Sequence, residues 1–454
     1  MNNQKDELLC RMAQDKELKG LRDALCQLHP VDIAELLEEL YARTQQHERP
    51  VILFRTLPKD LAVEVFAELS PNAQQTLIGT MTDRELGSIV EELFVDDAVD
   101  MLEELPATMV KRVLKAAEPE TRRLINQFLR YPEDSAGSVM TAEFMELKAD
   151  MTVGEAIRAI RETGEDCESI YTSYVTDGKR VLEGAVEIQD LLLAPDSCPV
   201  RDLMGETAPL RVTTTEDQEE VAKLFSRYNL VTLPVVDSEQ RLVGMITVDD
   251  VVDIIQQETT EDMELMGGMH PSETPYLKTG VLTLAKHRIV WLLVLMVSGM
   301  LTGSILGRYE EAFAALPLLV TFIPMLTDTG GNAGSQSSTL VIRGLALGEI
   351  RRRDIFRVVW KEFRISILVG LLLAGVNYLR LLLTYPDLGL TGLVVSIALV
   401  ATVIMAKVIG AILPIVADCL KVDPAIMAAP LITTTVDALS LMLYFNVAQS
   451  LLHL

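Results

Sequence analysis

Residues 324–339 form a polar, glycine-rich segment between two apolar runs, where a membrane-spanning helix would ordinarily be apolar. The segment reads Pro324-Met-Leu-Thr-Asp-Thr-Gly-Gly-Asn-Ala-Gly-Ser-Gln-Ser-Ser-Thr339. At helical spacing its polar residues share one face: Asp328, Asn332, Ser335 or Gln336, Thr339 and Arg343. Polar groups inside a bilayer usually mark a transport path, and they need water or a partner helix. The pattern therefore predicts a helix that forms one wall of an ion path.

A second carboxylate, Asp437, lies about 12 residues into the last apolar run, which begins after Asp423-Pro424. At about 1.5 Å per residue this is roughly 18 Å from the end of the run, near the bilayer midplane. A charge there costs about 3 kcal/mol or more unless it meets water, a cation or a hydrogen-bonding partner. A cation site is the favoured interpretation, and a protonated carboxyl that joins helices is the alternative.

The neighbours of Asp437 favour a particular kind of ion. Thr433, Ser440 and Tyr444 share its helical face, and they offer hydroxyl oxygens rather than further carboxylates. One carboxylate is a poor cage for a bare divalent ion, but it suits Mg²⁺, which usually keeps several waters. Lys407 could pair with a carboxylate, extend to the membrane interface or line a cavity.

The elements that must hold these residues are apolar helices. Five segments are each long enough to cross about 30 Å of hydrocarbon: residues 289–307, 312–342, 357–384, 390–417 and 425–452. Basic residues gather before the first segment and between the second and third, so the positive-inside rule puts the front of the chain in the cytoplasm and the C-terminus outside. Gly299, Gly303 and Gly307 form a double GxxxG pattern for helix packing.

The charge of the chain is divided sharply. Residues 1–270 hold 54 acids against 26 Lys and Arg, a balance of −28, and residues 271–454 hold 11 against 14, a balance of +3. An acidic front repels nucleic acid and attracts cations. The five cysteines and five histidines show no CxxC, HExxH or triad spacing, so neither a zinc site, a disulfide framework nor an enzyme is indicated.

Within the acidic front, residues 5–130 show a helical pattern in which acids precede short amphipathic turns, as at Asp32, Asp60 and Asp97. Helices broken at Pro30, Pro58, Pro71 and Pro106 are expected to stack as a small solenoid. Residues 135–257 change to a βαββα pattern that occurs twice. Leu182-Glu-Gly-Ala-Val-Glu-Ile-Gln-Asp-Leu-Leu192 corresponds to Leu242-Val-Gly-Met-Ile-Thr-Val-Asp-Asp-Val-Val252, sixty residues later.

The doubled unit resembles a CBS pair, a ligand-sensing module that often binds adenine nucleotides. With the connecting segment Glu258-Thr-Thr-Glu-Asp-Met-Glu-Leu-Met-Gly-Gly-Met269, the Gly330-Gly-Asn-Ala-Gly-Ser-Gln336 run and Asp437, the whole chain resembles the MgtE family of magnesium channels. The resemblance implies an all-α superhelical N domain at 1–130, an α/β CBS pair at 131–256, a connecting (plug) helix at 257–280 and an all-α transmembrane domain of five helices at 281–454.

The resemblance also implies roles for individual residues. Asp437 would hold hydrated Mg²⁺ in a homodimer whose pore is lined by the second and fifth spans, with Asn332 and Asp423 along the pore or its mouth. Cytoplasmic Mg²⁺ would bridge a set of regulatory acids and close the channel: Asp96, Asp100, Asp217, Glu219, Asp250, Asp253, Glu258, Glu261 and Asp262. Two departures from the family pattern, Asn229 and Ala429, affect one regulatory bridge and one contact at the pore mouth.

The leading hypothesis is therefore a passive Mg²⁺ channel in a bacterial-type plasma (inner) membrane, which admits Mg²⁺ to the cytoplasm and closes when the ion is plentiful. ATP at the CBS pair is a further possibility that the resemblance raises. Two alternatives stay open from the residues: a carrier or exchanger for another divalent cation such as Co²⁺ or Mn²⁺, and a membrane-anchored nucleotide sensor. An anchor would need neither Asp437 nor the polar face around Asn332.

Overall fold

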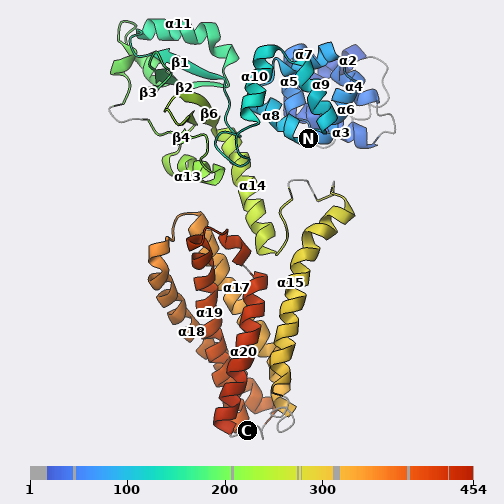
Figure 1. Ribbon diagram of the computed structural model, residues 1–454, viewed down its shortest axis with the longest axis vertical. Helices are drawn as coiled ribbons and strands as arrows, with labels where there is room; N and C mark the ends of the chain where they lie inside the picture. The colour runs from blue at the N-terminus through green and yellow to red at the C-terminus, as the bar shows by residue number, and fades with distance from the viewer. Residues whose placement is uncertain are drawn as a thin grey trace. The chain divides into compact units, whose positions relative to one another are not determined.

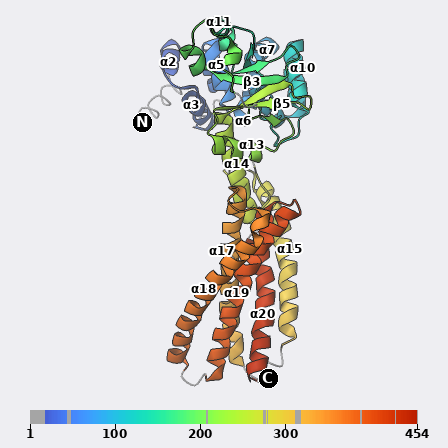
Figure 2. The same ribbon diagram turned by 90° about the vertical axis from the view of Figure 1, so that its left-hand side faces the viewer.

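The computed structural model of the chain describes residues 18–43, 48–205, 209–272, 276–277, 279–309, 317–385, 389–427 and 429–452. These residues fall into two compact units, Met1–Ile254 and Ile255–Leu454. Figure 1 and Figure 2 show that short helices and two small sheets make up the first unit and that long helices dominate the second. The expected second span, 312–342, begins in residues that lie outside this description.

Short helices form the first part of the first unit. Their bounds are α2 Leu18–Leu25, α3 Pro30–Arg43, α4 Glu48–Phe54, α5 Lys59–Ala67, α6 Pro71–Thr80, α7 Asp83–Val90, α8 Val95–Glu104, α9 Ala107–Ala116 and α10 Pro119–Phe128. The expected breaks at proline are confirmed, because Pro58 and Pro106 precede α5 and α9 while Pro30 and Pro71 begin α3 and α6. Proline suits these places because its fixed φ is helical and its missing N–H has no partner there.

The acids of the repeated units lie two or three positions after the cap residues, inside the helices. Asp60 and Asp97 lie in the first turns of α5 and α8, and the residues at the cap positions are Pro58 and Phe94. The expectation that these acids cap the helices is therefore wrong. Their carboxylates act instead on the positive end of the helix dipole, which stabilises a first turn without a capping hydrogen bond.

Two three-stranded sheets follow in the first unit. In each sheet the first and second strands are parallel, and the second and third strands are antiparallel. The first repeat comprises β1 Phe144–Lys148, α11 Val153–Thr163, η1 Gly164–Asp166, β2 Ser169–Thr176, β3 Leu182–Glu187, α12 Ile188–Leu193 and η2 Val200–Asp202. The second comprises β4 Val212–Thr213, α13 Gln218–Tyr228, β5 Thr232–Val236, β6 Leu242–Thr247 and α14 Val248–Met266. Because β3 and β6 begin at 182 and 242, the sixty-residue repeat is confirmed.

The two repeats are joined through their hairpins. The Leu182 N–H donates to the Gln240 carbonyl at 3.2 Å, and the Leu242 N–H donates to the Arg180 carbonyl at 2.8 Å. Arg180 and Gln240 occupy matching turn positions with φ of 63° and 65°. A small apolar cluster that includes Tyr174 lies between the sheets. The second repeat also shares one continuous core with the short helices α2–α10, so the first unit holds its acidic surfaces in fixed positions.

The second unit contains the apolar helices. Its elements are α15 Val281–Gly307, η3 Pro317–Phe322, α17 Ile323–Ala346, η4 Arg352–Asp354, α18 Ile355–Thr384, α19 Leu390–Cys419, η5 Pro424–Met427 and α20 Ala429–Leu452. Within the described ranges, four helical segments are long and apolar enough to cross a membrane, namely Val281–Gly307, Arg352–Thr384, Leu390–Cys419 and Pro424–Leu452. Helix α17 is long enough but too polar to be counted with them.

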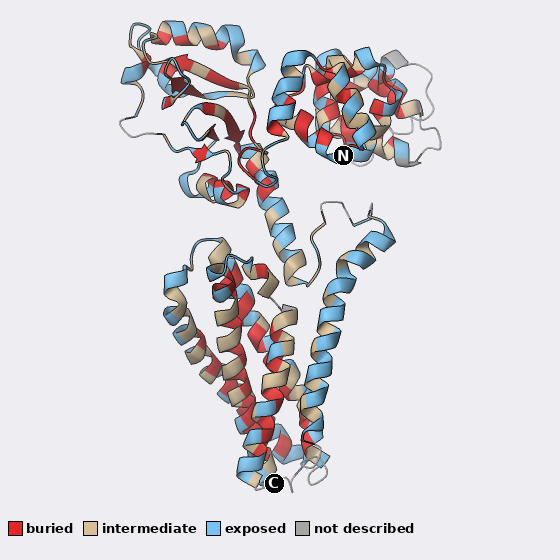
Figure 3. Ribbon diagram, in the orientation of Figure 1, coloured by how far each residue is buried: buried red, intermediate tan, exposed pale blue. Residues whose placement is uncertain are grey.

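Helices α17, α18, α19 and α20 pack side by side, whereas α15 lies next to α20 at the margin of the unit (Figure 1 and Figure 2). No residue of α15 is buried. Figure 3 shows the contrast, since buried positions are concentrated on the facing sides of α17, α19 and α20. The core of the second unit therefore forms around α17, the helix that carries the polar face.

Candidate cation sites

The polar face of α17 is present in the structure. Asp328, Asn332, Gln336, Thr339 and Arg343 are all exposed. The opposite face of the helix is buried, and its buried positions are mostly small residues. The prediction of a helix with a single polar stripe is thus confirmed, because the periodicity of polar and small residues matches the helical repeat.

Glycines let α17 approach its neighbours closely. A Cβ added at Gly334 would lie 2.6 Å from Ile432 Cγ2 and 3.1 Å from the Ala406 carbonyl oxygen. A Cβ at Gly410 of α19 would lie 2.2 Å from the Gly334 carbonyl oxygen. At Gly331 a Cβ would come within 2.9 Å of Thr433 Cγ2. A side chain at these contacts would force the neighbouring atoms to move, so the glycines of α17 let the helix pack closely against α19 and α20.

Asp437 of α20 is half-buried, and its carboxyl lies within electrostatic reach of the Asp328 carboxyl. The structure thus adds Asp328 as a second carboxyl whose charge acts on Asp437. The residues expected to share the Asp437 face behave differently. Ser440 and Tyr444 are fully buried, and the Tyr444 hydroxyl donates to the Leu319 carbonyl at 3.0 Å. These two residues pack α20 against its neighbours. Asp328 is the charged residue that acts on Asp437.

The donor set around Asp437 determines which ions it could hold. Among the described residues, no group of three or more His, Cys, Asp or Glu is arranged to hold a metal ion. Two carboxylates cannot replace the six or more oxygens around a hard divalent ion. An ion that retains its water shell can still bind, because the carboxylates accept hydrogen bonds from the bound waters.

Asp423 lies outside this pair. It is exposed, and its Oδ1 accepts a hydrogen bond of 2.7 Å from the Ala425 N–H, which fixes the start of η5. The Ser338 hydroxyl of α17 donates to the Met427 carbonyl at 3.2 Å and ties η5 to α17. Asp423 therefore lies on a turn that is connected to the polar helix.

A second acidic site lies in the first unit, where α8 meets the CBS pair. Burial raises the pKa of Asp97 to about 6, and repulsion from Asp250 and Glu68 adds to the shift. Burial also raises the pKa of Asp100 to about 7 and that of Asp96 well above its usual range, with Asp97 and Asp250 contributing to both. Carboxylates that repel one another bind protons or cations to relieve the repulsion.

The partner residues on the CBS side are Glu168 and Asp250. Burial, followed by repulsion from Asp250 and Asp97, raises the pKa of Glu168 to about 7. Burial also raises the pKa of Asp250, although the Thr247 hydroxyl opposes this by donating to Asp250 Oδ2 at 2.5 Å. Asp96, Asp97, Asp100, Glu168 and Asp250 are hereafter called the acidic surface.

The structure brings together some of the predicted regulatory acids and not others. Asp96, Asp100 and Asp250 meet in the acidic surface, and Asp253 adds repulsion on Asp250. Asp97 and Glu168 were missed. The adjacent Asp96-Asp97 pair is a signal that could have indicated Asp97, but Glu168 belongs to no motif and joins the acidic surface through the tertiary fold alone.

The remaining predicted acids lie elsewhere. Asp217 caps α13 by accepting a 2.8 Å hydrogen bond from the Glu219 N–H, and Glu219 pairs with Lys223 at 3.0 Å. Asn229, the departure from the family pattern, ends the same helix in a left-handed conformation that asparagine tolerates well. Glu258, Glu261 and Asp262 lie on the part of α14 that belongs to the second unit.

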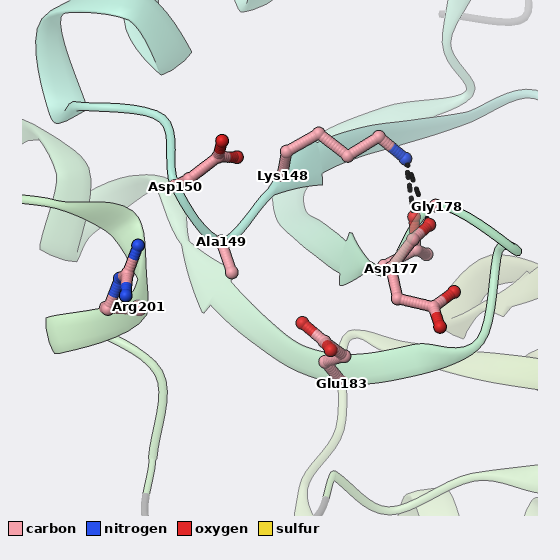
Figure 4. Close-up of a pocket in the computed structure, with 8 residues that line it drawn as sticks. Lys148, Ala149, Asp150, Asp177, Gly178, Glu183 and Arg201 are labelled. Carbon is pink, nitrogen blue, oxygen red and sulfur yellow. Dashed lines mark hydrogen bonds between the residues drawn. The ribbon is translucent and has the colours of Figure 1, made fainter.

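A hollow of about 380 Å³ lies in the first CBS repeat (Figure 4). Its lining residues are Lys148, Ala149, Asp150, Thr176, Asp177, Gly178, Glu183 and Arg201. Lys148 Nζ donates to Glu146 Oε1 at 2.6 Å and to Thr176 Oγ1 at 3.0 Å, and Arg180 Nε lies 3.4 Å from Oε2 of the same Glu146 carboxyl. Three acids against Lys148 and Arg201 leave the lining with a negative balance, which does not favour a polyphosphate.

Comparison with known proteins agrees with this architecture. Three family models match the chain: a divalent cation transporter model at residues 323–447, the MgtE intracellular N domain at 28–134, and the CBS domain at 136–197 and 200–257. These matches, together with the apolar helices, define a multi-pass cation transporter that carries a CBS pair.

The relatives identify the family more closely. The magnesium transporter MgtE of Thermus thermophilus is 38% identical over 444 residues, which cover 97% of each chain. The magnesium transporter MgtE of Bacillus subtilis is 32% identical over 451 residues, which cover 99% of this chain and 98% of that one. The crystal structure of the soluble part of a magnesium transporter superposes with a TM-score of 0.52 at 25% identity, over 56% of this chain and 98% of that one. The chain belongs to the MgtE family, whose members are magnesium transporters and not enzymes.

Proposed function

We propose that this chain is a Mg²⁺ channel that admits the ion to the cytoplasm and closes when cytoplasmic Mg²⁺ is plentiful. The conduction part of the proposal rests on two carboxylates, half-buried Asp437 of α20 and exposed Asp328 of α17. Asp328 belongs to the polar face of α17, a helix whose opposite face packs against apolar neighbours. An anchor for a nucleotide sensor would have no use for carboxylates at this depth, since each is costly inside a bilayer.

In the proposed pathway, Mg²⁺ keeps most of its water shell. Asp437 and Asp328 supply negative charge, while Asn332 supplies an amide oxygen to the bound waters. Binding through water is weak enough to release the ion again, which a conducting site requires. Mg²⁺ loses its waters reluctantly, so a site that leaves them in place favours it over ions that seek direct protein ligands.

The proposed gate uses the acidic surface and the helix that follows it. Without a cation, the carboxylates of Asp96, Asp97 and Asp250 repel one another, and bound Mg²⁺ removes the repulsion. Asp250 lies in the first turn of α14. In the second unit, Leu265 and Met266 at the end of α14 pack against Ile342 of α17 and Ala425 of η5. A shift of α14 would therefore reach both the polar helix and the turn beside Asp423.

Several finer features belong to the same proposal. The chain would work as a homodimer in a bacterial plasma membrane, with α17 counted as a fifth span, the N-terminal domains cytoplasmic and the C-terminus outside. The division into 1–130, 131–256, 257–280 and 281–454, and the superhelical stacking of α2–α10, remain predictions. So does ATP binding at the CBS pair, for which the charges of the hollow near Lys148 give no support.

Replacing the conducting carboxylate tests the proposal. We expect Asp437→Ala to abolish Mg²⁺ uptake in cells that depend on this protein, because Asp328 alone leaves the site with half of its negative charge. Thr435→Ala is a matched control, since Thr435 is exposed on the same helix about 160° away at about 100° per residue. Equal amounts of each variant in the membrane exclude a folding defect. Normal growth of the Asp437→Ala strain would reject the assigned pathway.

Electrical recording separates a channel from the alternatives. Mg²⁺ current through the purified protein in a planar bilayer should follow the Mg²⁺ gradient and be insensitive to Na⁺ and H⁺ gradients. A current or flux that requires either gradient would favour an exchanger. Larger currents with Co²⁺ or Mn²⁺ than with Mg²⁺ would favour transport of another divalent ion.

A further inference from the structure

Three polar side chains meet inside the helical bundle of the second unit, away from Asp437. They are Ser337 of α17, Glu362 of α18 and Lys407 of α19. Ser337 Oγ donates to Glu362 Oε2 at 2.6 Å, and Lys407 Nζ donates to Ser337 Oγ at 3.4 Å. Lys407 Nζ also lies 4.0 Å from the same Glu362 oxygen. The three groups are hereafter called the Ser337 triad.

The Ser337 triad is buried. The side chains of Lys407 and Glu362 are 6% and 10% exposed, and Ser337 is 1% exposed as a residue. Glu362 is seven residues into α18 and Lys407 is twelve residues before the end of α19, so both lie about 10–18 Å inside helices that are apolar enough to span a membrane. An apolar pair of similar size would often stabilise such a site at least as well as a buried ion pair does.

A buried ion pair differs from an apolar contact in being directional. Leucine side chains can slide past one another with little loss, whereas a hydrogen bond weakens steeply with angle and distance. A buried polar group is therefore suited to fixing the register or rotation of a helix. In the Ser337 triad the group that is fixed belongs to α17, and the groups that fix it come from two different helices.

The place of Ser337 on α17 shows what that constraint controls. At about 100° per residue, Ser337 lies about 180° from Asp328 and about 140° from Asn332. It is thus on the back of the helix relative to the polar face. A rotation of α17 that broke the bonds of Ser337 would turn Asn332 and Gln336 away from their present direction.

We propose that Glu362 and Lys407 are positioning residues that act through Ser337 to set the rotation of α17, and with it the direction of its polar face. This inference rests on the proposed function, in which that face lines the Mg²⁺ path. The small residues of α17 hold it close to its neighbours but place no directional limit on rotation, whereas the Ser337 triad supplies that limit.

Thiol labelling along α17 tests the proposal without depending on transport. In a full-length chain whose native cysteines are replaced, Gln336→Cys on the polar face should react rapidly with a positively charged, membrane-impermeant thiol reagent. Leu340→Cys, on an exposed position about 40° further round the helix, should react more slowly, because it lies further from the centre of the polar face. Adding Ser337→Ala should change the labelling rates at 336 and 340 severalfold and in the same direction, because both positions lie on the same side of Asn332 and move together when the helix turns.

Two further variants keep the test independent of folding. Glu362→Leu with Lys407→Leu removes both charges together, so it leaves no unpaired charge, and we expect it to fold but to shift the labelling pattern as Ser337→Ala does. The exchange Glu362→Lys with Lys407→Glu restores a carboxylate and an ammonium around Ser337, and it should return the pattern to that of the parent. An unchanged pattern in both Ser337→Ala and the double leucine variant would overturn the proposal, since it would leave the triad a stabilising role only.

The outcome is separable from that of the conduction test. Asp437→Ala should abolish uptake while leaving the labelling pattern at 336 and 340 intact. If the labelling shifts as expected but Asp437→Ala still transports Mg²⁺, the positioning role stands and the assigned pathway fails. If Asp437→Ala is inactive and the labelling does not shift in the triad variants, the pathway stands and the positioning role fails.

Discussion

Asp250 belongs both to the acidic surface and to the first turn of α14, and the Thr247 hydroxyl holds its carboxylate in position. Thr247 donates to one carboxylate oxygen, so Asp250 is held in place even while neighbouring carboxylates repel it. The equivalent residue of the first repeat, sixty positions earlier, is Asp190, which is exposed. The two repeats thus share a fold, although their aspartates at this position have different surroundings.

Neutralising the acids of α14 should weaken closure. We expect Asp250→Asn with Asp253→Asn to raise the open probability at millimolar Mg²⁺, because fewer carboxylates remain to bind the closing ion. Asp190→Asn is the matched control and should leave the Mg²⁺ response unchanged. Single-channel recording over a series of cytoplasmic Mg²⁺ concentrations makes the measurement. An unaltered response in the double variant would reject the sensor role of both residues.

The raised pKa values of the acidic surface predict a pH dependence. A carboxyl whose pKa is raised by folding binds more protons in the folded state, so the stability that it contributes falls as pH rises toward its folded pKa. Asp97, Asp100 and Glu168 have pKa values of about 6 to 7. Without metal, their contribution to the free energy of unfolding should therefore decrease between about pH 4 and pH 7.

Above that pH range the carboxylates are deprotonated, and bound Mg²⁺ should offset their repulsion in place of the protons. We expect half-maximal protection of the cytoplasmic part from protease to require about tenfold more Mg²⁺ at pH 6 than at pH 8. The reason is that carboxyl ligands with a pKa of about 7 are mostly protonated at pH 6. Protection of the full-length protein in detergent is the readout. The Asp250→Asn and Asp253→Asn double variant should show a smaller pH effect, and an equal effect would place the titrating groups elsewhere.

At the scale of elements, the contact between α17 and its neighbours is the most constrained. We expect Gly334→Ala to reduce Mg²⁺ uptake and to lower the free energy of unfolding by about 1–3 kcal/mol, because the new methyl group meets the Ala406 backbone and Ile432. Gly375→Ala on α18 is the control, since no atom lies within 4 Å of the position. Thermal unfolding and uptake should separate the two variants, and equal behaviour would mean that α17 is loosely packed.

The sequence predicted those elements whose signals are periodic. The polar stripe at Asn332, Gln336 and Thr339 repeats at helical spacing, and the strands β3 and β6 repeat at sixty residues, so both were found. The contacts between distant residues were not. Pairing with a carboxylate was one of three roles left open for Lys407, and nothing in the sequence indicates that Glu362, 45 residues away, is the partner. The role of Glu168 and the burial of Ser440 and Tyr444 likewise depend on which helices pack together.

The count of spans shows the same limit. Hydropathy merged residues 312–342 into a single apolar segment, whereas the described part of that stretch contains η3 and then α17, whose exposed face is polar. A helix that faces a water-filled path does not need to be apolar on every side. Its membrane character follows from its neighbours, which a window along the sequence does not include.

At the scale of the molecule, the exposed apolar surface of α15 predicts association. An added Cβ at Gly299, Gly303 or Gly307 would have no atom within 4 Å, so no other helix of the same chain packs against this glycine face of α15. We expect the purified protein to be a dimer in mild detergent and Gly303→Leu to increase the fraction of monomer, with Gly375→Leu as the control. Light scattering on detergent complexes measures the mass. A dimer unaffected by Gly303→Leu would place the interface on another helix.

The hairpins of the CBS pair have a consequence for how the sensor fluctuates. Because the Leu182 amide bonds to the Gln240 carbonyl and the Leu242 amide bonds to the Arg180 carbonyl, opening one hairpin removes a hydrogen bond from the other. Amide exchange in the two repeats should therefore occur through one cooperative opening, although the repeats carry different acids. A cation that binds next to Asp250 would then slow the fluctuations of both repeats, including the one that it does not touch.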